Sequence, residues 1–260
     1  MSAFSELLAS GKRFIFDGAM GTLLQARGLP PGESPEAFCL ARPDIPEGIH
    51  ADYARAGSDV LTTNTFGGTS FKLPVGIQVI EFNRLMTRAA KKAADETGRA
   101  LGRRIFVAGS VGPTGKFLRP LGDTAFEDMV QAFAEQIQGL AEGGADCILA
   151  ETQFDIAEAR AIVLAARRVC ALPVAVSMTY EDGRTLTGSS VAVCAATLAN
   201  MGVDLISMNC SAGPVEMQSA VSELLACSPV PVLIQPNAGL PQLEDGRTVF
   251  PLQPEAFARL

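Results

Sequence analysis

The sequence has a single histidine among its 260 residues, and this scarcity limits the chemistry that it can perform. That residue, His50, lies in PEGIHADYARAG (46–57), a helical pattern far from any expected strand end. A cysteine nucleophile needs a nearby base, so a cysteine and histidine pair is disfavoured. We predict that His50 is a surface or packing residue of a helix.

Other absences narrow the class of protein further. No window reaches the ~18 apolar residues of a membrane span, and the N-terminus lacks the layout of a signal peptide. The net charge of −7 argues against binding to nucleic acid or acidic lipid, and favours small neutral or zwitterionic substrates. We therefore expect a cytoplasmic protein.

The cysteines do not form the short paired spacings of a zinc finger or a redox motif. In a reducing compartment, most of them should be buried apolar thiols. The six positions are 39, 147, 170, 194, 210 and 227.

Short apolar runs recur along the chain with amphipathic helical patterns between them. A parallel sheet covered by helices is the expected result. The seven runs span residues 14–18, 59–66, 105–113, 147–153, 173–180, 205–214 and 231–239.

Two folds fit this repeat, a closed barrel and an open doubly wound sheet. No GxGxxG opens the first helix, and polar residues end nearly every run, which favours a TIM-type (β/α)8 barrel. Only seven strands can be counted before FPLQPEAFARL (250–260), which is expected to begin the seventh helix. We predict one domain over residues 1–260, truncated before the eighth strand and lacking its last β/α unit.

The polar residues at the ends of these runs are candidate site residues, because barrel enzymes place their chemistry at that rim. Each one taken alone could instead cap the following helix. The candidates are Asp17, Asn64, Ser110, Glu151, Thr179, Asn209, Cys210 and Asn237.

Two carboxylates among them could receive the amino group of an amino acid. Asp17 begins DGAMGT, where Gly18 allows a ligand to approach the backbone, although a helix cap or a turn is the alternative. Glu151 ends a buried run, and a buried carboxylate must be paired, hydrogen-bonded or protonated. A ligand's ammonium group or a salt bridge within the fold would satisfy it.

Cys210 follows Asn209 at the end of the sixth run, and SAGP then turns the chain. A cysteine at a barrel mouth can be a nucleophile, a metal ligand or a residue without a role in catalysis. The lack of a partner histidine makes a nucleophilic role unlikely, whereas a zinc-thiolate role and a residue without a role in catalysis both remain.

The chain resembles the homocysteine S-methyltransferase family, and most closely the N-terminal domain of its cobalamin-dependent methionine synthase branch. The likeness covers essentially the whole chain. It rests on seven motifs: DGAMGT (17–22), residues 41–68, GSVGPTGKFLRPLG (109–122), AETQFDIAEA (150–159), DGRTLTG (182–188), NCSAGP (209–214) and QPNAGLP (235–241).

The resemblance implies a zinc site of three cysteines, of which Cys210 matches the first. The other two, an adjacent pair in a GGCCG segment, are expected beyond residue 260. It also implies that Asp17 and Glu151 receive the amino group of homocysteine. Gly18, Asn64, Ser110 and Asn237 are further substrate contacts, and Asn237 could instead occupy a zinc position.

The implied activity is zinc-dependent activation of the homocysteine thiol, which then takes a methyl group from methylcobalamin to give methionine. The cobalamin- and folate-binding domains are expected downstream in the same polypeptide. A stand-alone methyltransferase using betaine or S-methylmethionine is one alternative, and a non-catalytic binding or structural barrel is another. The isolated 260-residue chain is expected to be inactive.

Overall fold

The computed structural model describes residues 2–240, 242–244 and 247–260. It divides into two compact units. The first unit comprises residues 1–149 and 161–174, and the second comprises residues 150–160 and 175–260.

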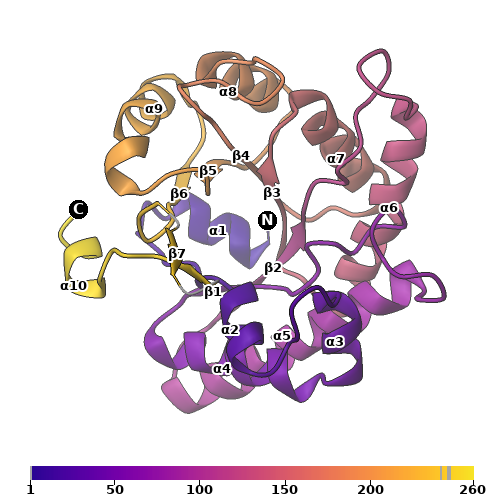
Figure 1. The fold of residues 1–260 in the computed structure, drawn as a ribbon, viewed down its shortest axis with the longest axis vertical. Coiled ribbons are helices and arrows are strands. Elements are labelled where there is room, and N and C mark those ends of the chain that lie inside the picture. The colour runs from indigo at the N-terminus through magenta and orange to yellow at the C-terminus, as the bar shows by residue number, and fades with distance from the viewer. Residues whose placement is uncertain (1, 241, 245–246) are drawn as a thin grey trace. The chain divides into compact units, whose positions relative to one another are not determined.

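The strands form a sheet in which β1 to β6 follow one another in chain order, and they alternate with helices (Figure 1). This is the expected β/α repeat. The strands are β1 (Val60–Thr62), β2 (Phe106–Val111), β3 (Cys147–Gln153), β4 (Val174–Met178), β5 (Leu205–Asn209) and β6 (Val232–Gln235).

The helices before β2 are α1 (Ala3–Ala9), α2 (Gly21–Ala26), α3 (Pro35–Ala41), α4 (Asp44–Ala56) and α5 (Val79–Leu101). The later helices are α6 (Phe126–Gly143), α7 (Ile156–Val169), α8 (Val191–Asn200), α9 (Pro214–Cys227) and α10 (Pro254–Phe257). Among the described residues, no helix is both long and apolar enough to cross a membrane.

The strands are parallel and largely apolar, as expected for a sheet covered by helices. All six residues of β2 and all five of β5 are buried. In the first unit Val60 of β1 pairs with Phe106 of β2. In the second unit Ala175 pairs with Leu205, and Ile206 pairs with Val232.

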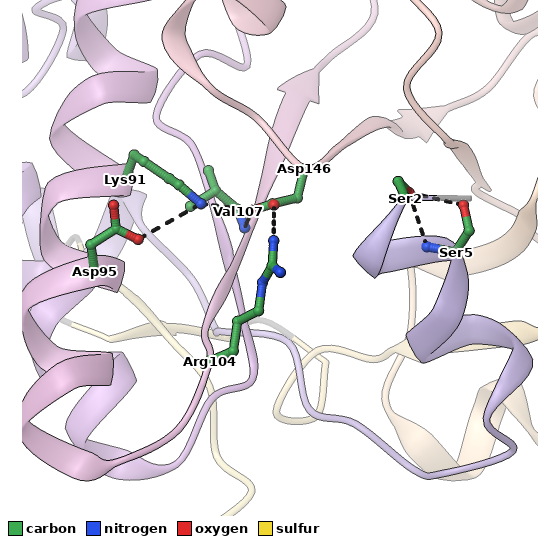
Figure 2. A network of polar contacts seen from close by, with 7 residues as sticks. All are labelled: Ser2, Ser5, Lys91, Asp95, Arg104, Val107 and Asp146. Atoms are coloured by element: carbon green, nitrogen blue, oxygen red, sulfur yellow. Dashed lines mark hydrogen bonds and ion pairs between the residues drawn. The ribbon is translucent and has the colours of Figure 1, made fainter.

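The start of β2 is held by a carboxylate in the first unit (Figure 2). Asp146 accepts the backbone N–H of Val107 at 2.9 Å through Oδ2. The same oxygen lies 3.2 Å from Nζ of Lys91, and Oδ1 lies 3.1 Å from Arg104. Because these contacts lie at the amino ends of the strands, they serve stability, whereas chemistry in this class of fold occurs at the carboxyl ends.

Helices α5 and α6 of the first unit approach closely at a glycine. A Cβ atom at Gly139 would lie 2.4 Å from the carbonyl oxygen of Ile80 and 2.8 Å from Cβ of Asn83. Because one of these neighbours is backbone, it cannot rotate away.

We therefore expect Gly139→Ala to lower the free energy of unfolding by about 1–3 kcal/mol through overpacking. Gly48→Ala in α4 is the matched control, because there the nearest atom is the guanidinium end of Arg27, at 3.4 Å. It should raise stability by at most about 1 kcal/mol. Urea unfolding measures both variants, and equal stability of the two would contradict the close packing.

Several elements of the structure differ in detail from those predicted from the sequence. The first predicted strand, residues 14–18, is reduced to a single parallel bridge between Phe16 and Val60. The predicted seventh helix is one turn, α10. An antiparallel hairpin of β7 (Gln242–Glu244) and β8 (Arg247–Val249) precedes it and was not predicted.

His50 is fully buried in α4, so its prediction as a packing residue is confirmed and the surface alternative is wrong.

Candidate functional site

In the second unit, Cys210 lies immediately after β5 in a sharp turn. Cys210 and Ser211 both have left-handed backbones, with φ of 56° and 62°. The N–H of Cys210 donates to the carbonyl of Gln235 at the end of β6, at 3.2 Å, and the N–H of Ala212 donates back to the carbonyl of Cys210 at 2.7 Å. Left-handed backbone is costly for residues other than glycine, and such strain is concentrated at functional sites.

Asn237 joins the same turn through its backbone. Its N–H donates to the carbonyl of Ala212 at 3.0 Å, and its side chain is half-buried. The loop after β6 is therefore fixed beside the Cys210 turn, which brings together two residues that the sequence predicted for the site. The role of the Asn237 side chain stays a prediction.

The thiol of Cys210 is half-buried, and burial raises its pKa above the ordinary value. The negative charge of Glu151 raises the pKa further, whereas hydrogen bonds from Thr152 and Asn209 lower it. The thiol is therefore protonated at neutral pH when no cation is present. Deprotonation would require a positive charge next to the sulfur.

A cavity of about 350 Å³ lies beside this turn, within the range of small-molecule sites. Thr179, after β4, and Ser211 line it together with the loop at 180–186. The second unit thus places a strained cysteine, a nearby carboxylate and a cavity at the carboxyl ends of neighbouring strands.

In the first unit, Asp17 lies directly after the bridge residue Phe16. Its Oδ2 accepts the N–H of Thr62 at 2.8 Å, so this oxygen ties the DGAMGT loop to the end of β1. The hydroxyl of Tyr53 donates to the carbonyl of Ala19 at 2.8 Å. Burial and the charge of Asp17 raise the pKa of Tyr53 to about 12.

A Cβ atom at Gly18 would lie 2.8 Å from the hydroxyl oxygen of Tyr53, so a larger residue there would displace the Tyr53 side chain. Sequence reasoning missed Tyr53. Its position in a helical segment far from the strand ends gave no sign of this contact.

The other two first-unit candidates are Asn64 and Ser110. Asn64 is half-buried, and its side chain is close enough to the thiol of Cys39 to oppose the rise in the pKa of that thiol. Ser110 is fully buried within β2, where its carbonyl accepts the hydroxyl of Thr65 at 2.7 Å. Their predicted contacts with substrate stay predictions.

The side chains of the described residues do not form a complete zinc site. No group of three histidine, cysteine, aspartate or glutamate side chains gathers there. Cys39, Cys147 and Cys194 are buried, and burial raises the pKa of Cys39 to about 12. Cys210 is the only one of the six cysteines in a strained strand-end turn.

Comparison with known proteins gives the family. The homocysteine S-methyltransferase family model matches residues 14–260. The methionine synthase of Mycobacterium tuberculosis is 36% identical over 264 residues, which cover 96% of this chain and 22% of that protein. That of Mycobacterium leprae is 37% identical over 259 residues, covering 93% of this chain and 21% of that protein. The chain spans about a fifth of the length of these relatives.

Solved structures agree with the fold. The metallated form of the homocysteine methyltransferase MmuM from Escherichia coli matches with a TM-score of 0.79 and 24% identity, over 90% of this chain and 86% of that chain. At that identity the likeness concerns the fold alone, and it confirms the predicted α/β class of TIM-barrel type. The family model covers nearly the whole sequence, and the chain belongs to the homocysteine S-methyltransferase family.

Proposed function

We propose that this chain binds homocysteine and activates its thiol for methyl transfer from methylcobalamin, which gives methionine. The observation that carries the proposal is the Cys210 turn, which holds a half-buried sulfur beside hydrogen-bond donors and the carboxylate of Glu151. The family match and the two methionine synthases support the same reaction.

Cys210 contributes one of three thiolate ligands to a zinc ion in this proposal. The other two cysteines lie beyond residue 260, in keeping with relatives about five times as long. Cys210 would be one of the residues that hold the ion, and the ion would supply the positive charge that favours deprotonation of a thiol. Because burial raises the pKa of the Cys210 thiol, this side chain needs such a cation to become a ligand.

The carboxylates bind the amino group of homocysteine. Glu151 is close enough to Cys210 for its charge to raise the pKa of the Cys210 thiol. An ammonium group bound beside Glu151 would therefore lie near the sulfur. Asp17 is assigned to the same amino group by the family motif. Holding the amino acid by one end orients its thiol for reaction at the other.

The methyl donor is carried on another part of the longer polypeptide, recharged there from methyltetrahydrofolate. The likeness to full-length methionine synthases over 96% of this chain favours methylcobalamin over a small-molecule donor. Assays of the long polypeptide with methylcobalamin and with S-methylmethionine as the only donor distinguish the two. Turnover with S-methylmethionine alone would overturn the assignment of the donor.

Zinc stoichiometry tests the ligand set. We expect the 260-residue chain to retain little zinc and to show no methyl transfer, because one thiolate cannot hold the ion as three do. The polypeptide extended beyond residue 260 should bind one zinc ion tightly. Tight equimolar zinc in the short chain would contradict the assignment.

Asp17→Asn should weaken homocysteine binding in the long polypeptide by about ten- to a hundredfold, the loss of one hydrogen bond to a charged group. The asparagine oxygen can still accept the N–H of Thr62, so this contact with the end of β1 can be retained while the negative charge is removed. The KM for homocysteine measures the effect. An unchanged KM would show that Asp17 only supports the loop.

A further inference from the structure

The side chain of Asn209 touches the ends of three strands in the second unit. Its Oδ1 accepts the N–H of Thr152 in β3 at 3.1 Å and the hydroxyl of Ser177 in β4 at 2.7 Å. Asn209 itself ends β5 and is 4% exposed. A buried amide with this many partners is held in one orientation.

The partners also fix which end of the amide faces Cys210. A backbone N–H can only donate, so the atom facing Thr152 N is the carbonyl oxygen of the amide. The amide nitrogen therefore donates to the hydroxyl of Thr152 at 2.9 Å and to Sγ of Cys210 at 3.3 Å. All four hydrogen-bonding positions of the Asn209 side chain are used, so a flip of the amide would cost several bonds at once.

The two residues that Asn209 holds are both strained. Thr152 has φ of 60°, which is exceptional for a β-branched residue, and Cys210 has φ of 56°. Each such conformation is energetically costly and persists only where its surroundings enforce it. The amide of Asn209 supplies that enforcement, through two bonds to Thr152 and one to the sulfur of Cys210.

We propose that Asn209 is a positioning residue, which aims an N–H donor at the sulfur of Cys210 and fixes the strand end that carries Glu151. The proposal rests on the role proposed above for Cys210. The rigid amide of Asn209 thereby sets the separation between Glu151, which receives the amino group of the substrate, and Cys210, which acts at its sulfur. Donors to a metal-binding sulfur also tune its basicity.

Asn209→Asp is the sharpest test, because it changes the charge and donor pattern with little change of shape. One carboxylate oxygen can keep the bonds from Thr152 and Ser177, whereas the other replaces the N–H that faces the sulfur. Negative charge at that point opposes the thiolate. The test uses the 260-residue chain and a neutral alkylating reagent at a single neutral pH. We expect alkylation of Cys210 to slow by at least about threefold. A tenfold loss of thiolate would be partly offset, because a more basic thiolate is also more nucleophilic.

The exposed Cys227 in the same molecule is the internal reference, and peptide mass analysis separates the two sites. A purely structural role predicts the opposite result, because loosening of the turn would expose Cys210 and speed its alkylation. A faster or unchanged rate for Cys210 relative to Cys227 overturns the proposal.

Asn83→Asp is the matched control for a buried amide in the first unit. That side chain donates to the carbonyls of Gly68 and Val79, at 2.7 and 2.8 Å. Its replacement should lower thermal stability and leave the relative rate at Cys210 unchanged. A fall of the same size in the rate at Cys210 would show that the Asn209 result does not depend on the contact between its amide and the sulfur.

Thr152 provides a second pair of variants if Asn209→Asp does not fold. Thr152→Val keeps the shape but removes the hydroxyl that accepts the Asn209 amide and lies 4.0 Å from Sγ of Cys210. Thr152→Ser retains the hydroxyl. The valine variant should slow alkylation of Cys210 and the serine variant should restore it, and equal rates in the two would overturn the proposal.

The failure of this proposal is distinguishable from failure of the proposed function. If Cys210→Ala retains zinc in the long polypeptide, the ligand assignment fails whatever Asn209 does. If Cys210→Ala loses zinc and Asn209→Asp leaves the alkylation rate unchanged, the ligand assignment stands and only the positioning role is wrong.

Discussion

Replacement of Cys210 by alanine should abolish zinc retention in the polypeptide extended beyond residue 260. The mutation removes a proposed ligand itself, so its effect should exceed the roughly 10- to 100-fold loss of affinity that follows removal of an outer-shell partner. Methyl transfer should be lost with the metal. Zinc content after dialysis against a chelator measures the first effect, and methionine formation measures the second.

Cys227→Ala is the matched control. Cys227 is exposed at the end of α9, and its thiol donates to the carbonyl of Leu224 on its own helix, at 3.7 Å. This variant should retain zinc and activity at the level of the parent. Zinc bound normally by Cys210→Ala would show that Cys210 is not a ligand.

The fold was predictable because its pattern is local. Continuous apolar runs with amphipathic stretches between them are visible in the sequence, and every run corresponds to a strand or a bridge at the expected place. The β7 and β8 hairpin was missed, although the Asp-Gly pair in LEDGRTVF (243–250) is a hairpin signal. No element was predicted for residues 240–249, because the expected helix began only at residue 250.

The site was predictable only in part, because side-chain contacts depend on register and turn geometry. Cys210 was predicted as a site residue because it follows the end of a strand, and the structure places it in a strained turn. The hydrogen bonds that the Asn209 oxygen accepts from Thr152 and Ser177 join residues up to 57 positions apart, and no spacing rule reveals them. Asp17 was singled out as a ligand contact, yet one of its oxygens also ties the loop to β1, a role that the sequence alone does not show.

His50 should make the stability of the chain fall as the pH is lowered from neutral. Its side chain is fully buried in α4, and neither ring nitrogen has a hydrogen-bond partner among the described residues. Burial lowers its pKa from 6.5 to about 4. The unfolded chain therefore binds one more proton than the folded chain between those two pH values.

The sign and size of the effect follow from this difference. The contribution of the neutral His50 side chain to the free energy of unfolding is fully present above the pKa of the unfolded chain. It is lost as the pH falls toward the pKa of the folded chain. It amounts to about 3 kcal/mol across the whole window and about 2 kcal/mol at pH 5. Wild-type protein should therefore lose much of its free energy of unfolding between pH 7 and pH 5.

His50→Leu should remove this dependence. The leucine keeps an apolar side chain of similar size in the core and eliminates two buried nitrogens that lack partners, so stability at pH 7 should be equal or higher. Urea unfolding at pH 7 and pH 5 measures both chains. The difference between them isolates His50, because every other titrating group is shared. If the two chains lose equal stability on acidification, the buried imidazole is not the group that titrates.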